Sequence, residues 1–189
     1  MSGRPGIGIA DRLAATTLLA LWLAGCASDG EGYRRSTLAL PIPVTSGTHI
    51  ETPAHPLECV PYARARSGIL LYGNAGAWWV SAEGRYARNQ TPLLGSVMVL
   101  TGYAGPGRGH VGVVSELVSA REIRIDHANW LGDGAIYLDD PVADVSQDNR
   151  WTEVRIWNPR SRSWGTKTYL VEGFIGPSRV HRPDRVAAE

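Results

Sequence analysis

The distribution of apolar and polar residues divides the first part of the chain into two segments. Residues 13–23 are mostly apolar and follow two arginines. A run of this length is too short to span a bilayer and is typical of the apolar part of an export signal. The next thirty or so residues are polar, rich in Pro, Gly, Thr and Ser, and lack a sustained period. We therefore predict a signal peptide at residues 1–25 and a tether at residues 26–56.

Two helical segments follow the predicted tether. Residues 57–71 form a compact segment in which Pro61 is tolerated within a first helical turn and Gly68 marks a possible end. Residues 77–88 predict a second, weaker helix whose aromatic side chains can pack. After this helix, the character of the sequence changes to that of strands.

The second half of the chain carries short runs with the period of strands. The predicted strands are residues 95–100, 110–115, 122–130, 152–157 and 167–175. Helices followed by a meander of strands predict an α+β fold, with N-terminal helices packed on an antiparallel β-sheet. We expect the domain to cover residues 57–176 and a flexible tail to follow at residues 177–189.

Composition limits the possible functions. Hydrophobic residues make up 43% of the chain and charged residues 20%, which suffices for one globular domain with a core. The 19 basic residues nearly balance the 18 acidic ones, and no block of like charge occurs. The sequence therefore argues against nucleic acid as the main partner. It does not indicate an oligomeric state.

Two predicted strands bring polar side chains toward one another. In the strand at 122–130, His127 and Asn129 continue the face that begins with two isoleucines. His110 starts the preceding strand, directly after a glycine-rich loop. If the two strands pair antiparallel, His110 lies next to His127 and Asn129. Polar groups in such a row need partners, because burying one unpaired costs about 1–3 kcal/mol.

Cys59 stands where the first predicted helix begins, and four roles are open to it. It can be a buried thiol, a disulfide partner of Cys26, a metal ligand or a nucleophile. A helix N-terminus and a nearby imidazolium both stabilise a thiolate. His110 would then act as the base, and His127 or Asn129 would orient its ring.

A zinc site is the main alternative that uses the same side chains. Its ligands would be Cys59, His110, Asp126 and His127. These residues lack the compact spacings of zinc sites, and the alternation of the strand points Asp126 away from His127. We therefore expect no metal and no other cofactor.

The end of the apolar run resembles the cleavage box of bacterial lipoproteins. This box is the stretch LAGC at residues 23–26, followed by small and polar residues. The resemblance implies that Cys26 receives a lipid and anchors the protein to a membrane of the bacterial cell envelope, facing the periplasm. Ala27 after the cysteine slightly favours the outer membrane. Lipidation of Cys26 would leave Cys59 without a disulfide partner.

A second resemblance covers residues 57–158. It is carried by the segments ECVPYAR (58–64), GNAGAWW (73–79), GSVMV (95–99), GHVGVV (109–114) and NW (129–130). In this order they resemble the landmarks of the CHAP domain, the cysteine, histidine-dependent amidohydrolases and peptidases with a papain-like fold. The resemblance implies that Cys59 is the nucleophile and His110 the base. Many family members carry a Glu where this chain has His127, so either His127 or Asn129 can be the residue that orients His110.

The CHAP resemblance implies a cell-wall hydrolase that cleaves amide bonds of peptidoglycan as an amidase or an endopeptidase. The alternative is a catalytically inactive CHAP-like lipoprotein that binds peptidoglycan or an envelope partner. A binding domain has no need of the thiol, whereas an enzyme of this kind loses its reaction without it.

Overall fold

The computed structural model describes residues 48–177. The expected signal peptide, Cys26, most of the expected tether and nearly all of the expected tail lie outside the described residues, and these assignments stay predictions. Within residues 48–177, no helix is long and apolar enough to cross a membrane.

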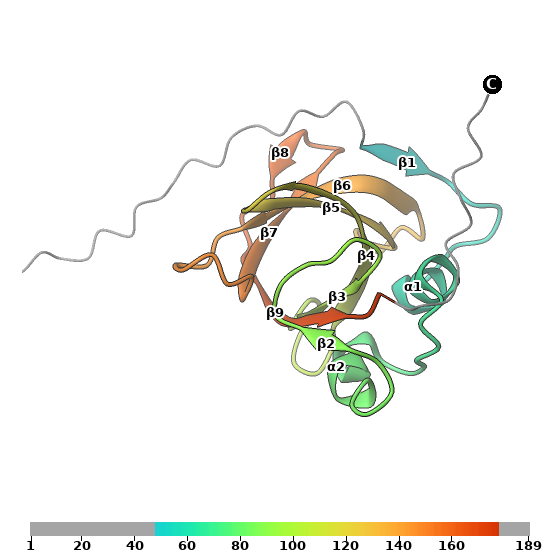
Figure 1. Ribbon diagram of the computed structural model, residues 1–189. Helices are drawn as coiled ribbons and strands as arrows, with labels where there is room; N and C mark the ends of the chain where they lie inside the picture. Colours follow the sequence, from blue (N-terminus) through green and yellow to red (C-terminus); the bar gives the residue numbers. More distant parts are fainter. Residues whose placement is uncertain (1–47, 178–189) are drawn as a thin grey trace, which may run out of the picture. The chain divides into compact units, whose positions relative to one another are not determined.

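Six antiparallel strands close into a barrel (Figure 1). They are β3 (Val97–Thr101), β4 (His110–Ser119), β5 (Glu122–Ala128), β6 (Ile136–Asp144), β7 (Glu153–Asn158) and β9 (Tyr169–Ile175). The order β6-β5-β4-β3-β9-β7 returns to its start because β7 also pairs with β6. Closure leaves the ring without free strand edges. The predicted antiparallel sheet is therefore a barrel, and the fold is mostly β while remaining broadly α+β.

Three short strands extend the barrel. They are β1 (His49–Glu51), β2 (Arg88–Asn89) and β8 (Ser163–Trp164). Strand β1 pairs with β6 and falls in the range expected for the tether. The backbone N–H of Leu57 also donates to the carbonyl of Gly134 at 3.0 Å. The paired structure thus begins before Leu57.

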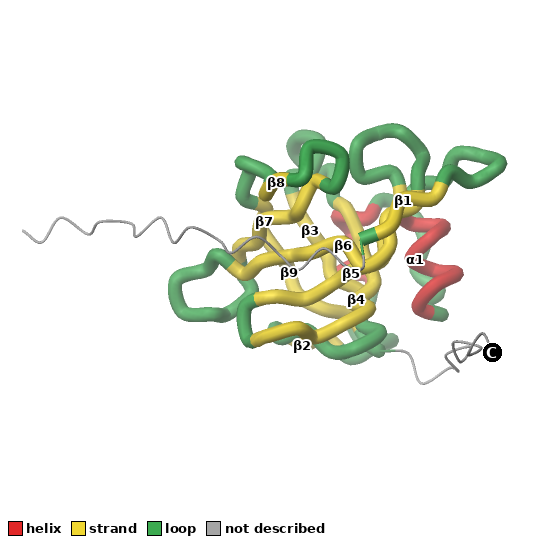
Figure 2. The backbone as a smooth tube through the Cα atoms, turned by 90° about the horizontal axis from the view of Figure 1, so that it is seen from above, coloured by secondary structure: helices red, strands yellow, loops and turns green. Residues whose placement is uncertain are grey.

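The first helix, α1 (Cys59–Ser67), forms where the sequence predicts it. Pro61 is the third residue of α1, so its missing N–H removes no bond within the helix. Gly68 ends the helix in the left-handed conformation, with a φ of 73°, and its N–H donates to the carbonyl of Arg64 at 3.0 Å. Figure 2 shows α1 against the outside of the barrel, beside β4 and β5.

The second helix is shorter than the sequence predicts. A 3₁₀ turn, η1 (Ala75–Ala77), leads into α2 (Trp78–Ser81), and turns replace the expected helical residues up to Ala87. Gly84, with a φ of 68°, leaves the helical conformation in the middle of the predicted segment. The structure thus corrects the helix expected at 77–88 to a single turn.

Strand β6 is the main element that the sequence does not predict. Pro141 and three aspartates interrupt its apolar pattern. Tertiary pairing overrides the weak local signal, because β6 joins β5 on one side and β7 on the other. The five predicted strands all overlap strands of the barrel.

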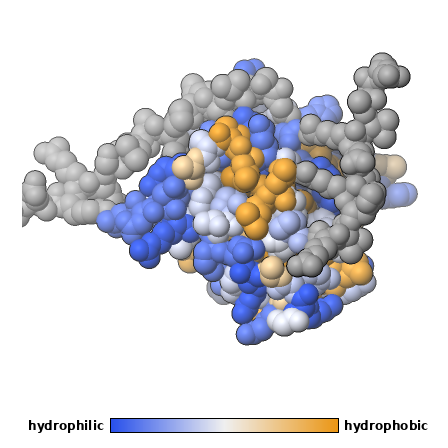
Figure 3. Space-filling model, viewed as in Figure 1, coloured by the Kyte–Doolittle hydropathy of each residue, from blue (hydrophilic) through white to orange (hydrophobic). Residues whose placement is uncertain are grey.

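The barrel wall separates two apolar cores. Side chains such as Met98 and Leu100 of β3 belong to the inner cluster, while Val97 and Val99 belong to an outer cluster beneath α1 and α2. This alternation explains why β3 is buried along most of its length. On the face shown in Figure 3, by contrast, apolar side chains form separate groups on a mostly hydrophilic surface.

An ion pair joins α1 to the barrel. The Nε of Arg66 lies 2.8 Å from Oδ2 of Asp126 on β5, and Oδ1 of Asp126 accepts the backbone N–H of Asp139 at 3.0 Å. The Asp126 side chain is only 4% exposed, whereas that of Arg66 is 32% exposed. Asp126 therefore depends on Arg66 to offset the cost of its burial, and the pair fixes the helix that begins with Cys59.

Replacing Arg66 tests this anchor. Arg66→Ala leaves the buried Asp126 carboxylate without its cation, and we expect the free energy of unfolding to fall by about 2 kcal/mol. Arg150→Ala removes a pair whose side chains are 74% and 61% exposed, and should cost less than about 0.5 kcal/mol. Urea denaturation measures both values. Equal losses in the two variants would contradict the anchoring role of Arg66.

Candidate functional site

His110 is the first residue of β4, and two glycine-containing loops hold the backbone before it. A Cβ at Gly109 would lie 2.4 Å from the backbone nitrogen of Gly76, so only glycine permits this approach. Asn74 joins the same loops, since its Nδ2 donates to the carbonyl of Gly107 at 3.0 Å and its Oδ1 accepts the N–H of Gly76 at 2.9 Å. These contacts between the two loops therefore fix the backbone that leads into His110.

The pairing of β4 with β5 brings His127 toward His110. The two strands run antiparallel and meet at the turn between Ser119 and Glu122, as the sequence predicts. Gly112 makes room for the facing strand, because a Cβ at this position would lie 2.8 Å from Cδ1 of Ile125 and 3.4 Å from Cβ of His127. The GHVGVV segment thus supplies both His110 and Gly112, the glycine that leaves space for His127.

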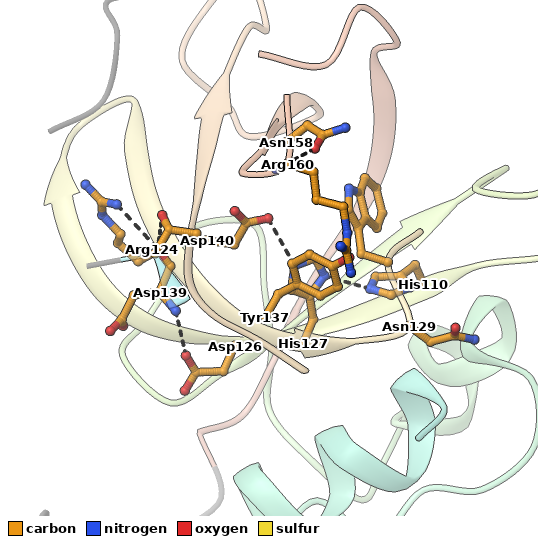
Figure 4. Close-up of polar contacts among 12 residues, drawn as sticks. His110, Arg124, Asp126, His127, Asn129, Tyr137, Asp139, Asp140, Asn158 and Arg160 are labelled. Atoms are coloured by element: carbon orange, nitrogen blue, oxygen red, sulfur yellow. Dashed lines mark hydrogen bonds and ion pairs between the residues drawn. The ribbon is translucent and has the colours of Figure 1, made fainter. Parts of the chain in front are cut away.

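Three buried side chains form a continuous hydrogen-bonded chain (Figure 4). Nε2 of His110 lies 2.9 Å from Nδ1 of His127, and Nε2 of His127 lies 3.1 Å from Oδ2 of Asp140 on β6. His110 is 1% exposed, and the other two side chains are fully buried. Asp140 is not predictable as a site residue from the sequence, because it lies in a strand whose apolar pattern is interrupted by Pro141 and aspartates.

Aromatic rings enclose the two histidines. The ring of Tyr103 lies 4.9 Å from that of His110, and the ring of Trp130 lies 5.0 Å from it. Tyr137 contacts His127 at 5.4 Å. The hydroxyl of Tyr103 donates to the carbonyl of Trp130 and so closes this wall. These rings exclude water from the imidazoles and fix their planes.

Cys59 approaches the same end of β4 from α1. It is partly buried against the outer core, and its thiol is hydrogen-bonded by the backbone of Val111, the residue after His110. It also acts electrostatically on Tyr103, the ring that packs on His110. The structure therefore brings Cys59, His110 and His127 to one end of the barrel.

Burial shifts the pKa values of His110 and Cys59. Desolvation, and next the proximity of His127, hold the pKa of His110 well below its ordinary value. Burial also raises the pKa of the Cys59 thiol, although backbone hydrogen bonds from Val111, Val60 and Cys59 itself oppose the rise. Burial thus favours the neutral form of both groups, the thiol of Cys59 and the imidazole of His110.

Asn129 occupies a different place from that of His127. It lies just beyond β5 with a φ of 60°, so it does not continue the strand as the alternation predicts. Its Nδ2 donates to Oε2 of Glu58 at 2.9 Å, and its Oδ1 accepts the N–H of Gly134 at 2.8 Å. Figure 4 shows its side chain directed away from the two histidines. Asn129 is thus hydrogen-bonded to Glu58, the residue before Cys59, whereas His127 is hydrogen-bonded to His110.

One known protein family matches the part of the chain that contains most of this site. The family model described as the CHAP domain matches residues 51–129. Residues 51–129 form a CHAP domain. The matched segment includes Cys59, His110, His127 and Asn129, while Asp140 lies beyond it. No curated protein matches the chain.

The match to the CHAP domain at residues 51–129 has general implications. CHAP domains are generally amidohydrolases or peptidases, and the family suggests peptidoglycan as substrate and a location outside the cytoplasm. The resemblance recognised in the sequence is confirmed by this match. The lipoprotein signal stays a prediction.

The protonation of Cys59 can be measured by alkylation. Because burial raises the thiol pKa, little thiolate exists at neutral pH, and the rate of reaction with iodoacetamide should increase about tenfold per pH unit between about pH 7 and 9. Peptide mapping by mass spectrometry separates Cys59 from Cys26. N-Acetylcysteine in the same tube serves as the ordinary thiol for comparison, and above about pH 9 its rate should level off before that of Cys59. A rate at Cys59 that is already constant near pH 7 would contradict a raised thiol pKa.

Proposed function

We propose that this CHAP domain is a cysteine-dependent hydrolase that cleaves amide bonds of peptidoglycan. The observation that carries the proposal is the hydrogen bond between Nε2 of His110 and Nδ1 of His127. It occupies one nitrogen of His110 and leaves the other, Nδ1, for the thiol of Cys59. The arrangement of a cysteine on a helix against a histidine on a strand supports the papain-like assignment.

The first half of the reaction forms a thioester. The sulfur of Cys59 attacks the amide carbonyl while its proton passes to Nδ1 of His110. The charge that develops on the carbonyl oxygen is stabilised by backbone N–H groups in the first turn of α1, which has no side-chain cap, that of Cys59 among them. The carbon–nitrogen bond then breaks, and His110 returns the proton to the leaving amine.

The second half restores the enzyme. His110 takes a proton from water, whose oxygen attacks the thioester carbonyl. The carbon–sulfur bond breaks, and His110 donates the proton to the sulfur of Cys59. The products are a carboxylic acid and an amine, so the overall reaction consumes one water molecule and requires no cofactor.

The proposed function includes a location. A signal peptide at residues 1–25 and a lipid on Cys26 would hold the enzyme in the bacterial envelope, facing the periplasm, where its substrate lies. The outer membrane is the slightly favoured anchor. The domain beyond the anchor would then act as an amidase or as an endopeptidase.

One observation favours the alternative of an inactive peptidoglycan-binding or partner-binding domain. The raised pKa of Cys59 leaves its thiol less reactive than a preformed thiolate. The hydrolase remains the better-supported function, because a buried base with one free nitrogen, next to a cysteine at a helix start, serves no purpose in binding alone.

Removal of the nucleophile distinguishes the two functions. Cys59→Ala should lower the release of new amino groups from purified peptidoglycan by at least about 10³-fold and leave thermal unfolding nearly unchanged. His110→Gln should cause a comparable loss, whereas replacing the exposed His55 by Gln should cause none. A Cys59→Ala variant as active as the wild type would contradict the mechanism.

A further inference from the structure

We propose that Asp140 is a positioning residue that fixes the tautomers of both histidines and thereby leaves Nδ1 of His110 free to accept the proton of Cys59. The proposal rests on the hydrolase function proposed above and adds a fourth member to its machinery. It follows from the direction of the hydrogen bonds through the chain His110–His127–Asp140.

The direction is set at the carboxylate. Burial raises the pKa of Asp140, while the hydrogen bond and the charge of His127 oppose the rise. When Asp140 is ionised it can only accept hydrogen bonds, and Nε2 of His127, at 3.1 Å from Oδ2, then carries a proton. The second oxygen, Oδ1, is buried without a hydrogen-bond partner among the described residues. The contact with His127 is therefore the hydrogen bond that offsets the burial of this carboxylate.

The direction then passes to His110. With its proton on Nε2, neutral His127 presents a lone pair at Nδ1, 2.9 Å from Nε2 of His110. Nε2 of His110 must therefore donate. Burial lowers the pKa of His110 and so favours the neutral ring, whose single proton is used in this bond, and Nδ1 is left as a base.

The opposite direction is unfavourable while Asp140 is ionised. A proton on Nδ1 of His110 would require His127 to donate from its own Nδ1. A neutral His127 would then direct the lone pair of Nε2 at the carboxylate, and the two acceptors would repel each other in a site without water. The charge of Asp140 thus selects the tautomer of His110 that catalysis needs, although two histidines separate Asp140 from the sulfur of Cys59.

A purely structural role explains this arrangement less well. Replacing a buried ion pair by apolar side chains of similar volume is often neutral or stabilising, so burial alone does not require a carboxylate here. Arg124 also acts electrostatically on Asp140, but the hydrogen bond of Asp140 goes to His127. The side chain is therefore placed to act through the histidine.

Asp140→Asn tests the proposal, because it keeps the shape and removes the charge. An amide can donate from Nδ2 to His127, which reverses the chain and places a proton on Nδ1 of His110. We expect kcat for peptidoglycan hydrolysis to fall by about 10²–10⁴-fold with little change in KM. The matched control is Asp144→Asn, a buried carboxylate on the same strand that caps Ser146 and does not contact the histidines, and it should retain kcat.

Nitrogen-15 NMR of the histidine rings gives a readout besides activity. In the wild type, Nδ1 of both His110 and His127 should be unprotonated at neutral pH, and Asp140→Asn should shift the proton of His110 to Nδ1. A wild-type His110 protonated at Nδ1, or a His127 protonated at both nitrogens, would overturn the proposal even if no Asp140 variant folds. An unchanged kcat in folded Asp140→Asn would do the same.

The two proposals fail in different ways. If Cys59→Ala retains activity, the hydrolase mechanism is wrong while the ring tautomers can still be as described. If Cys59→Ala is inactive but Asp140→Asn matches the Asp144→Asn control, the mechanism stands and the role of Asp140 is wrong.

Discussion

The hydrogen bond between the buried rings of His110 and His127 is the interaction on which the site depends. It determines which nitrogen of His110 remains available, and it exists because an antiparallel pair of strands meets across a glycine gap at Gly112. In the proposed mechanism, a buried acceptor beyond this bond sets its direction, and Asp140 of β6 lies in hydrogen-bonding contact with His127 to do so. Barrel closure, which brings β6 beside β5, is therefore part of the chemistry as well as of the fold.

Burial favours the neutral forms of Cys59 and His110 over a preformed pair of thiolate and imidazolium. Desolvation lowers the pKa of His110 and raises that of Cys59, so burial favours the neutral form of each. In the proposed mechanism, proton transfer then accompanies the attack of sulfur on the carbonyl, with His110 as a general base, as it does for a hydroxyl nucleophile. The raised pKa lowers the reactivity of the free thiol. The surrounding aromatic rings, in turn, hold His110 in a fixed orientation.

Much of the site was predictable from the sequence, and the exceptions have physical reasons. The helix start at Cys59 and the pairing of His110 with His127 follow from local patterns of proline, glycine and alternation. Strand alternation predicts Asn129 on the same face as His127, but β5 ends at Ala128 and the backbone turns at Asn129 with a positive φ. Asp140 was missed because β6 is held by pairing on both sides rather than by its own apolar pattern.

The central claim is that the sulfur of Cys59 forms a covalent bond with the acyl group of the substrate. Rapid acid quenching of the purified domain during turnover of a soluble peptidoglycan fragment, followed by mass spectrometry of its peptides, measures this directly. The account predicts that the peptide containing Cys59 gains the mass of the acyl fragment as a thioester, and that the gain disappears on treatment with hydroxylamine. Hydrolysis that proceeds with Cys59 unmodified, or with the acyl group on another residue, would contradict it.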